Sequence, residues 1–188
     1  MRYIGIMDKT ISLLERLGNL LQQQLREDAN ELGLQTVHLQ ILSYLQRANR
    51  YSDIPIAVAE YLGLTRGTVS QSIKLLQQKG LLIQRNQLAA RRKVHLQLTE
   101  QGKAVLQASW LHSLQAELAE DTSAAARLEM TLESLLGKLQ RARGNAAFGV
   151  CRGCVFHQRE QTGARCGLTG ESLSEQETLQ LCREWQSP

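Results

Sequence analysis

Residues 54–80 read IPIAVAEYLGLTRGTVSQSIKLLQQKG and contain two helical segments with only a short turn between them. Ser52–Asp53 offers N-cap chemistry to the first segment, Pro55 suits its first turn, and Gly63 is typical of a helix end. The second segment begins almost at once, with Thr65 in an N-cap position. Two helices joined so tightly predict a helix-turn-helix.

The second helix of this motif has two different faces. Its apolar side chains, Val69, Ile73 and Leu76, recur at helical spacing, so we expect them to be buried. At 100° per residue the opposite side presents small, amide and cationic side chains, which suit a helix in a DNA major groove. That side carries Gly67, Gln71, Lys74 and Gln78, with Thr68 and Ser70 on its flanks.

The pattern changes after this helix to one typical of two strands. Leu81–Arg85 and Val94–Leu98 are apolar or alternating, which predicts a two-stranded hairpin. The tip between them ends in three consecutive cations, Arg91, Arg92 and Lys93. A hairpin with a basic tip after such a helix is a wing.

Basic charge is concentrated in this part of the chain. The whole sequence has a formal charge of +4, whereas Thr65 to Lys103 holds eight basic residues and one acidic residue. Clustered cations bind polyanions because neutralising phosphates releases counterions. We therefore expect a localised surface for nucleic acid.

The remainder of the chain is expected to be helical. Of the 188 residues 43% are apolar and 4% aromatic, with two prolines, a composition that favours helices over a sandwich or barrel. Leucine-rich patterns predict helices over Asp8–Asp28, Thr36–Gln46, Lys103–Glu120 and Ala124–Arg143. No stretch resembles a signal peptide or a membrane span, so the sequence indicates a cytoplasmic protein.

Three linked pieces of sequence resemble the MarR family of bacterial transcriptional regulators: Leu64–Ser70, Leu76–Arg85 and Arg91–Gly102. The resemblance covers about Asp8 to Arg143. It implies a dimeric winged helix-turn-helix whose first and last two helices join the protomers. The recognition helices would enter successive major grooves of a pseudopalindromic operator, and the wing arginines would reach the minor groove or phosphates.

The resemblance also supplies candidate DNA contacts, which are Thr65, Arg66, Thr68, Ser70, Gln71 and Lys74 in the helix-turn-helix, and Arg91, Arg92 and Lys93 at the wing tip. The family usually has an aspartate before the arginine pair, where this chain has Ala90. Many relatives bind small aromatic acids beside the dimer helices, but the sequence gives no basis for such an effector here.

All four cysteines lie after the region of resemblance, as Cys151-x-x-Cys154, Cys166 and Cys182. In a reducing cytoplasm, cysteines gathered in one short segment are more typical of metal ligands or redox sensors than of disulfides. Gly153 would permit the turn that aims two thiolates at one ion. We therefore predict a metal site that staples a segment too short to fold alone.

The identity of the metal is left open by the sequence. Zinc and a [4Fe–4S] cluster both accept four thiolates. One cysteine pair followed by two single cysteines looks more like the pattern of high-potential iron–sulfur proteins than that of zinc ribbons, so the cluster is slightly favoured. His157 could replace one ligand. The Ser174–Glu177 capping box predicts a short helix carrying Cys182 about two turns along.

The sequence thus predicts a mainly α protein with a small β-hairpin wing, plus a metal-stapled C-terminal segment. The boundaries are 8–143 for the dimeric winged helix, with a DNA-binding lobe at about 36–102, and 144–188 for the cysteine-rich extension. The expected function is a DNA-binding regulator, acting as a repressor and responding to redox state or iron. Loss of the cluster would alter the last dimer helix and the spacing of the recognition helices.

Two alternatives remain. One is the same regulator with a structural zinc site and no sensing role. The other is an iron–sulfur electron-transfer or enzyme subunit, although no nucleophile–base pair or phosphate loop is present.

Overall fold

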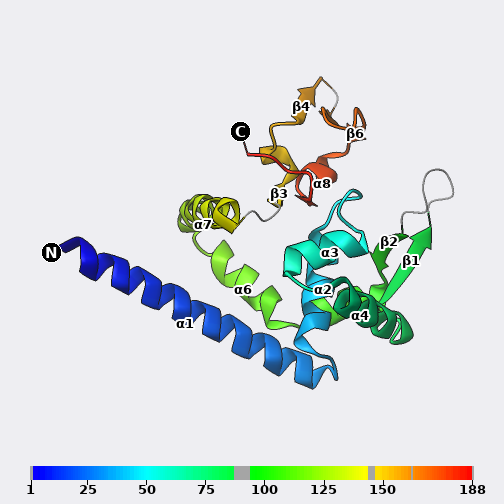
Figure 1. The fold of residues 1–188 in the computed structure, drawn as a ribbon, viewed down its shortest axis with the longest axis horizontal. Coiled ribbons are helices and arrows are strands. Elements are labelled where there is room, and N and C mark those ends of the chain that lie inside the picture. Colours follow the sequence, from blue (N-terminus) through cyan, green and yellow to red (C-terminus); the bar gives the residue numbers. More distant parts are fainter. Residues whose placement is uncertain (1, 87–93, 144–146, 162, 188) are drawn as a thin grey trace.

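The computed structural model describes residues 2–86, 94–143, 147–161 and 163–187, and the chain is mainly helical with small antiparallel sheets (Figure 1). Two helices precede the helix-turn-helix: α1 (Arg2–Glu31) and α2 (Thr36–Arg47). The motif and its wing follow as α3 (Pro55–Leu62), α4 (Arg66–Gln78), β1 (Leu82–Asn86) and β2 (Val94–Leu98). Three more helices are α5 (Glu100–Gln107), α6 (Trp110–Ala119) and α7 (Thr122–Arg143).

The helix-turn-helix forms as the sequence predicts. Gly63 ends α3 with a positive φ of 65°, a left-handed conformation that glycine adopts without strain. Thr65 caps α4, and its Oγ1 accepts a hydrogen bond from the Thr68 backbone N–H at 3.2 Å. The turn between the helices is therefore fixed by one glycine and one threonine.

The N-cap predicted for α3 is wrong. The cap residue is Ile54, which has no side-chain oxygen to offer. Ser52 and Asp53 do not cap the helix because their side chains have other partners, namely Asn49 and His95.

The core of the DNA-binding lobe lies where α2, α3, α4 and the hairpin meet. Tyr44 at its centre is fully buried, and its hydroxyl donates a hydrogen bond to the Ser52 carbonyl at 2.8 Å. Other fully buried side chains of this core are Leu39, Ile41, Leu42, Val58, Val69, Leu76 and Leu82. The hairpin pairs Leu82 with Leu98, so both strands bury leucine against α2 and α4.

The helix predicted over Lys103–Glu120 is two helices. The break lies at Ser109, whose hydroxyl donates to the Leu106 carbonyl at 2.8 Å. The next backbone N–H, that of Trp110, donates to the Asp28 carboxylate of α1 at 2.8 Å. These side-chain partners replace helical backbone bonds, so the chain turns and α6 begins in a new direction.

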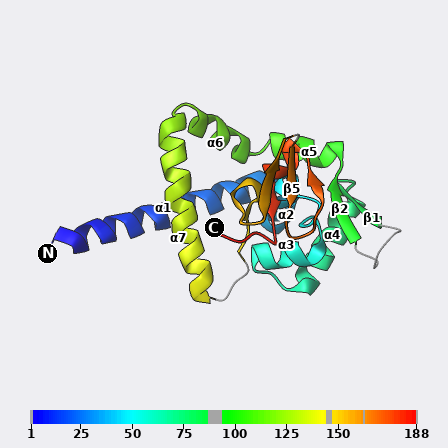
Figure 2. The ribbon, with the colours of Figure 1, turned by 90° about the horizontal axis from the view of Figure 1, so that it is seen from above.

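The first and last helices extend away from the DNA-binding lobe. Seen from above, α7 crosses the line of α1 (Figure 2). Among the described residues, no helix combines the length and the apolar character needed to cross a membrane.

The segment after α7 forms a small lobe, called here the cysteine lobe and comprising residues 147–187 as described. It has two sheets: β3 (Gly149–Val150) pairs with β7 (Leu181–Cys182), and β5 (Gly163–Cys166) lies between β4 (His157–Glu160) and β6 (Ser172–Leu173). A 3₁₀ turn spans Cys151–Gly153, and α8 spans Glu175–Thr178.

The predicted helical position of Cys182 is wrong. The capping box forms, because the Ser174 side chain accepts from the Glu177 N–H and the Glu177 carboxylate accepts from Ser174. The helix nevertheless lasts one turn. Beyond it the chain pairs with β3, and the Leu181 carbonyl accepts from the Asn49 N–H, so Cys182 lies in a strand.

Candidate nucleic-acid interface and cysteine site

Helix α4 presents the face that the sequence predicts for DNA. Val69, Ile73 and Leu76 are at most 2% exposed and anchor the helix in the core. The candidate contacts Thr65, Arg66, Thr68, Ser70, Gln71 and Lys74 are all exposed. Helix α4 and the hairpin lie side by side at the end of the molecule opposite the N-terminus (Figure 1). The wing cations Arg91, Arg92 and Lys93 lie outside the described residues, as does Ala90.

The base of the wing is tied to the loop before α3. His95 of β2 pairs through Nδ1 with the Asp53 carboxylate at 2.6 Å, and the Leu96 N–H donates to the Asp53 carbonyl at 2.7 Å. Burial raises the pKa of Asp53, and the pairing with His95 partly offsets this rise. The hairpin is therefore positioned by the same loop that leads into the helix-turn-helix.

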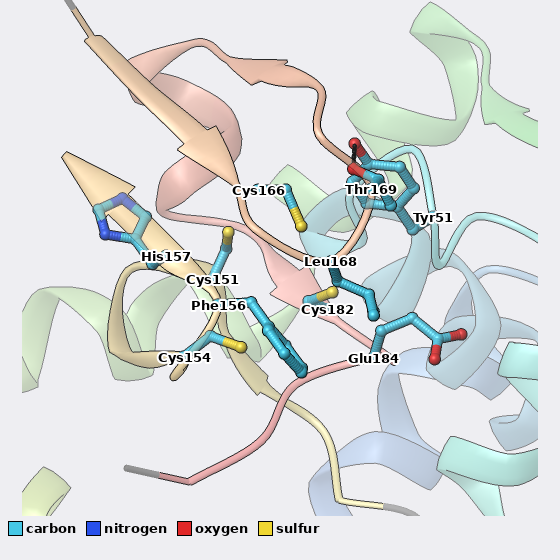
Figure 3. Close-up of a pocket in the computed structure, with 10 residues that line it drawn as sticks. All are labelled: Tyr51, Cys151, Cys154, Phe156, His157, Cys166, Leu168, Thr169, Cys182 and Glu184. Carbon is cyan, nitrogen blue, oxygen red and sulfur yellow. Dashed lines mark hydrogen bonds between the residues drawn. The ribbon is translucent and has the colours of Figure 1, made fainter. Parts of the chain in front are cut away.

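The four cysteines line one pocket, whose empty space amounts to about 350 Å³ with open solvent included (Figure 3). Cys151 comes from the 3₁₀ turn, Cys154 follows that turn, Cys166 ends β5 and Cys182 ends β7. The close-up shows their sulfurs around a shared space that Phe156 also borders. The structure thus brings together the four cysteines that the sequence predicts as ligands.

The thiols of the cavity are held in a partly apolar setting. Cys151 and Cys182 are 5% and 7% exposed, and all four cysteines are free thiols. Burial raises the pKa of Cys151 to about 11, and the neighbouring cysteines add to the rise. The Gln186 N–H donates to the Cys154 sulfur at 3.4 Å.

The sulfurs surround a space without converging on a point. Within the described ranges, no three His, Cys, Asp or Glu side chains form a group that could hold a metal ion as it stands. The ring of His157 lies beyond Cys151 and away from the other sulfurs (Figure 3). The four sulfurs therefore border one space, but they are not gathered around a single ion position.

Phe156 and Tyr51 line the cavity, whereas Trp185 does not. Trp185 lies on the Gly149 backbone, so closely that a Cβ at Gly149 would come within 2.5 Å of the indole ring. The glycine is required there for β3 and the indole to stack. Trp185 is therefore a packing residue of the cysteine lobe.

The cysteine lobe docks on the loop between α2 and α3. At its rim, Arg50 donates to the Ser172 carbonyl at 2.6 Å and forms ion pairs with Glu171 and Glu177. The Tyr51 hydroxyl donates to Glu171 at 2.5 Å. Sequence reasoning missed this docking, and the only local signal was a run of polar residues in a loop expected to serve α3 alone.

An aromatic cluster joins the two lobes below this rim. Phe148, 8% exposed, meets the rings of Tyr61 and Tyr44 edge-on at centroid distances of 5.2 and 6.3 Å. Such contacts contribute about 1 kcal/mol each beyond burial. The chain entering the cysteine lobe is therefore anchored in the core of the DNA-binding lobe.

Comparison with protein families matches residues 32–93 to the MarR family. Among solved structures, MepR of S. aureus in a complex with DNA has a TM-score of 0.54 at 18% identity, covering 68% of this chain and 94% of MepR. A MarR-family transcriptional regulator from Silicibacter pomeroyi has a TM-score of 0.56 at 20% identity, covering 74% and 93%. The chain has the MarR winged-helix fold.

A third structure with the MarR fold, CouR from Rhodococcus jostii RHA1 bound to p-coumaroyl-CoA, has a TM-score of 0.52 at 18% identity, covering 65% of this chain and 88% of CouR. A comparison with curated proteins finds no match. The match to the MarR family ends at residue 93, so it does not extend to the four cysteines.

The MarR fold of this chain also contains a cavity that the sequence did not indicate. It has a volume of about 710 Å³ and lies between α1, α2, α3 and α6. Leu21, Leu25, Tyr61 and Trp110 contribute apolar walls, and Arg47 contributes a cation. Asp28 contributes an acidic group, so the lining is apolar with one charged side chain of each sign.

Proposed function

We propose that the protein is a DNA-binding transcriptional regulator, acting as a repressor in the bacterial cytoplasm, that binds a pseudopalindromic operator as a homodimer. The observation that carries this proposal is the orientation of α4. Its apolar face is buried while all six candidate contacts, among them Arg66, Gln71 and Lys74, face solvent beside the base of the wing. MepR, which shares the fold, has been captured on DNA.

A homodimer is supported by apolar surface on the helices that extend from the lobe. The exposed side chains of α1 are Ile11, Leu13, Leu14, Leu17 and Leu20, and those of α6 and α7 are Leu118, Leu128, Met130, Leu132, Leu135, Leu136 and Leu139. Monomeric proteins rarely expose so many neighbouring apolar side chains. A second copy would cover both surfaces and set the distance between the two α4 helices.

The test of DNA binding uses the full-length protein and duplexes selected from a random library. We expect a selected pseudopalindrome, a stoichiometry of two chains per duplex, and an affinity that falls steeply with salt. Replacing Arg91 and Arg92 by alanine should reduce the salt slope. Binding without sequence preference would refute the proposal, and the absence of DNA binding would favour the electron-transfer or enzyme alternative.

We further propose that the four cysteines hold a [4Fe–4S] cluster whose loss changes DNA affinity. The supporting observation is the shared cavity, because a cluster spreads its thiolate ligands around several iron atoms, whereas zinc draws four sulfurs to about 2.3 Å from one centre. Zinc would fit only if the loops closed in. The four thiolates would bind the cluster. The loop between α2 and α3, on which the cysteine lobe docks, would transmit the loss of the cluster to the DNA-binding lobe.

The metal is identified on protein purified without oxygen. A cluster predicts a brown protein with a broad absorption band, together with about four iron and four sulfide per chain. A colourless protein with about one zinc per chain would refute the cluster and leave the structural-zinc alternative.

A further inference from the structure

The ligand Cys182 lies between two hydrogen bonds that reach the DNA-binding lobe. On one side the Leu181 carbonyl accepts from the Asn49 N–H at 3.0 Å. On the other side the Arg183 N–H donates to the Ser52 hydroxyl at 2.8 Å. A candidate ligand is thus fixed directly against the loop that precedes α3.

Asn49 is the residue of that loop whose backbone and side chain both join this network. It is 1% exposed, and its Oδ1 accepts from the Ser52 hydroxyl at 2.8 Å and from the Tyr51 N–H at 3.1 Å. Because Ser52 Oγ already accepts from Arg183, its own proton must point to Asn49. This network fixes the orientation of the amide, with Oδ1 toward the loop and Nδ2 away from it.

The Nδ2 end of Asn49 has no hydrogen-bond acceptor among the described residues, although it is buried. The amide lies beside Cys182 along the chain contacts, because the Asn49 N–H donates to the Leu181 carbonyl and Asn49 Oδ1 accepts from the Ser52 hydroxyl that binds the Arg183 N–H. A buried donor without an acceptor is destabilising. The energy of the Asn49 side chain therefore depends on whether the Cys182 sulfur is a thiol or a metal-bound thiolate.

A thiol and a metal-bound thiolate differ as acceptors. The thiolate carries negative charge and accepts a stronger hydrogen bond than a neutral sulfur does. N–H donors to ligand sulfurs are also a general means of tuning metal sites. An amide held rigidly beside Cys182 would thus gain an acceptor when the site is loaded.

We propose that Asn49 couples the occupancy of the cysteine site to the helix-turn-helix of the same chain, by donating a hydrogen bond from Nδ2 to the Cys182 sulfur in the metal-loaded protein. This rests on the proposed function of the cysteines. When the group is lost, the donor is left buried without an acceptor, and the loop before α3 loses one of its fixed contacts.

The loop can pass such a change to both DNA-binding elements. Ser52 bonds to Tyr44 in the core, and the next residue, Asp53, holds β2 of the wing through His95. Ile54 is then the N-cap of α3, which packs on α4. This route needs no movement of α7, in contrast to the route through the last dimer helix that the sequence suggested.

The test compares two neighbouring substitutions, Asn49→Asp and Arg50→Gln. Asn49→Asp keeps the oxygen that accepts from Ser52 and Tyr51 but replaces the donor at Nδ2. Arg50→Gln is the matched control, since Arg50 contacts the rim of the cysteine lobe at Ser172, Glu171 and Glu177. Both proteins are purified without oxygen, and part of each is stripped with a chelator under reducing conditions.

Two quantities are measured for the wild type and both variants: the operator affinity of the loaded and stripped forms, and the rate at which the metal–thiolate absorption disappears in air. In the wild type we expect the two forms to differ in affinity by about tenfold, the effect of one unsatisfied buried donor. In Asn49→Asp the ratio should fall to about twofold or less, with faster loss of the absorption. Arg50→Gln should behave as the wild type.

The outcomes distinguish a failure of the role of Asn49 from a failure of the proposed sensing function. Equal affinities of the two wild-type forms would refute sensing itself. A tenfold ratio kept by Asn49→Asp, with unchanged absorption kinetics, would refute the role of Asn49 alone. If Arg50→Gln lowers the affinity ratio as much as Asn49→Asp does, the docking of the cysteine lobe in general is responsible, and the specific role of Asn49 is refuted. If Asn49→Asp does not fold, Asn49→Ala gives the same readings without a buried carboxylate.

Discussion

Arg183 of the cysteine lobe binds Glu60 of α3 through two hydrogen bonds, from Nε at 2.6 Å and from Nη2 at 3.0 Å. The two side chains are 27% and 32% exposed, so water screens the pair only in part. A paired guanidinium and carboxylate in this geometry stabilises by about 1 kcal/mol. Among the described residues it is the one ion pair between the cysteine lobe and a helix of the helix-turn-helix.

Removing either partner should loosen the cysteine lobe on α3. We expect Glu60→Gln and Arg183→Gln each to lower the free energy of unfolding by about 1 kcal/mol, and the double variant to lose little more than either single one. Urea unfolding of the loaded protein measures this at low salt and in 1 M salt, where the effect should shrink. Glu160→Gln, which breaks the Arg165 pair inside the lobe, is the control, and its effect should add to that of Glu60→Gln.

Most of the fold was predictable because the residues that specify it lie close together in the sequence. The glycine and threonine between α3 and α4, and the apolar spacing of α4, specify that motif without distant partners. The break at Ser109 was not predictable, because it depends on Asp28, which is 82 residues from Trp110 along the chain. The strand at Cys182 was missed for the same reason, since its partners are β3 and Asn49.

The candidate sites also have a part that was predictable from local sequence and a part that was not. The cysteine spacing was enough to predict which four side chains would share a cavity, and periodicity was enough to find the exposed face of α4. The docking of the cysteine lobe was not predictable, because Arg50, Tyr51 and Ser52 look like ordinary loop residues until the rest of the chain returns to them. These loop residues connect α2 to α3 and also hold the cysteine lobe, and the second role leaves no pattern in the sequence.

Helix α4 leads to a prediction about DNA affinity. Lys74→Ala should weaken binding to all duplexes by a similar factor and lower the salt slope by about one, if Lys74 contacts a phosphate. Gln71→Ala should instead reduce discrimination between operator and non-operator, by about tenfold, if it reads a base. Fluorescence anisotropy at several salt concentrations gives both values. Arg159→Ala removes an exposed cation from the cysteine lobe and should change neither.

The exposed apolar side chains of α7 lead to a prediction about assembly. Leu139 is 52% exposed in the single chain, and a homodimer would cover it. We expect Leu139→Glu to shift the protein toward monomer at micromolar concentration, because burying a carboxylate in an apolar interface is unfavourable. Sedimentation velocity measures the shift. Leu179→Glu alters an equally exposed leucine, 54%, on the cysteine lobe, and a similar shift there would contradict the assignment of the interface.

The thiol of Cys151 leads to a prediction about pH. Burial raises its pKa from 9.0 to about 11, so in the metal-free protein the folded lobe keeps its proton where the unfolded chain has lost it. A raised thiol pKa therefore leaves stability unaffected below pH 9 and reduces it between pH 9 and 11, by about 3 kcal/mol in all. Denaturant unfolding of the stripped protein at pH 8 and pH 10.5 measures this loss.

The metal-loaded protein should behave differently over the same range. Its ligand thiols are already deprotonated, so no proton is retained on folding and the loss above pH 9 should be absent. For the same reason metal binding to the stripped protein should release protons, and the apparent affinity should rise with pH. Cys151→Ser in the stripped protein is the control, because the hydroxyl does not titrate here and the decline should shrink. A decline of equal size in that variant would assign it to other groups, such as Cys182, whose pKa burial also raises.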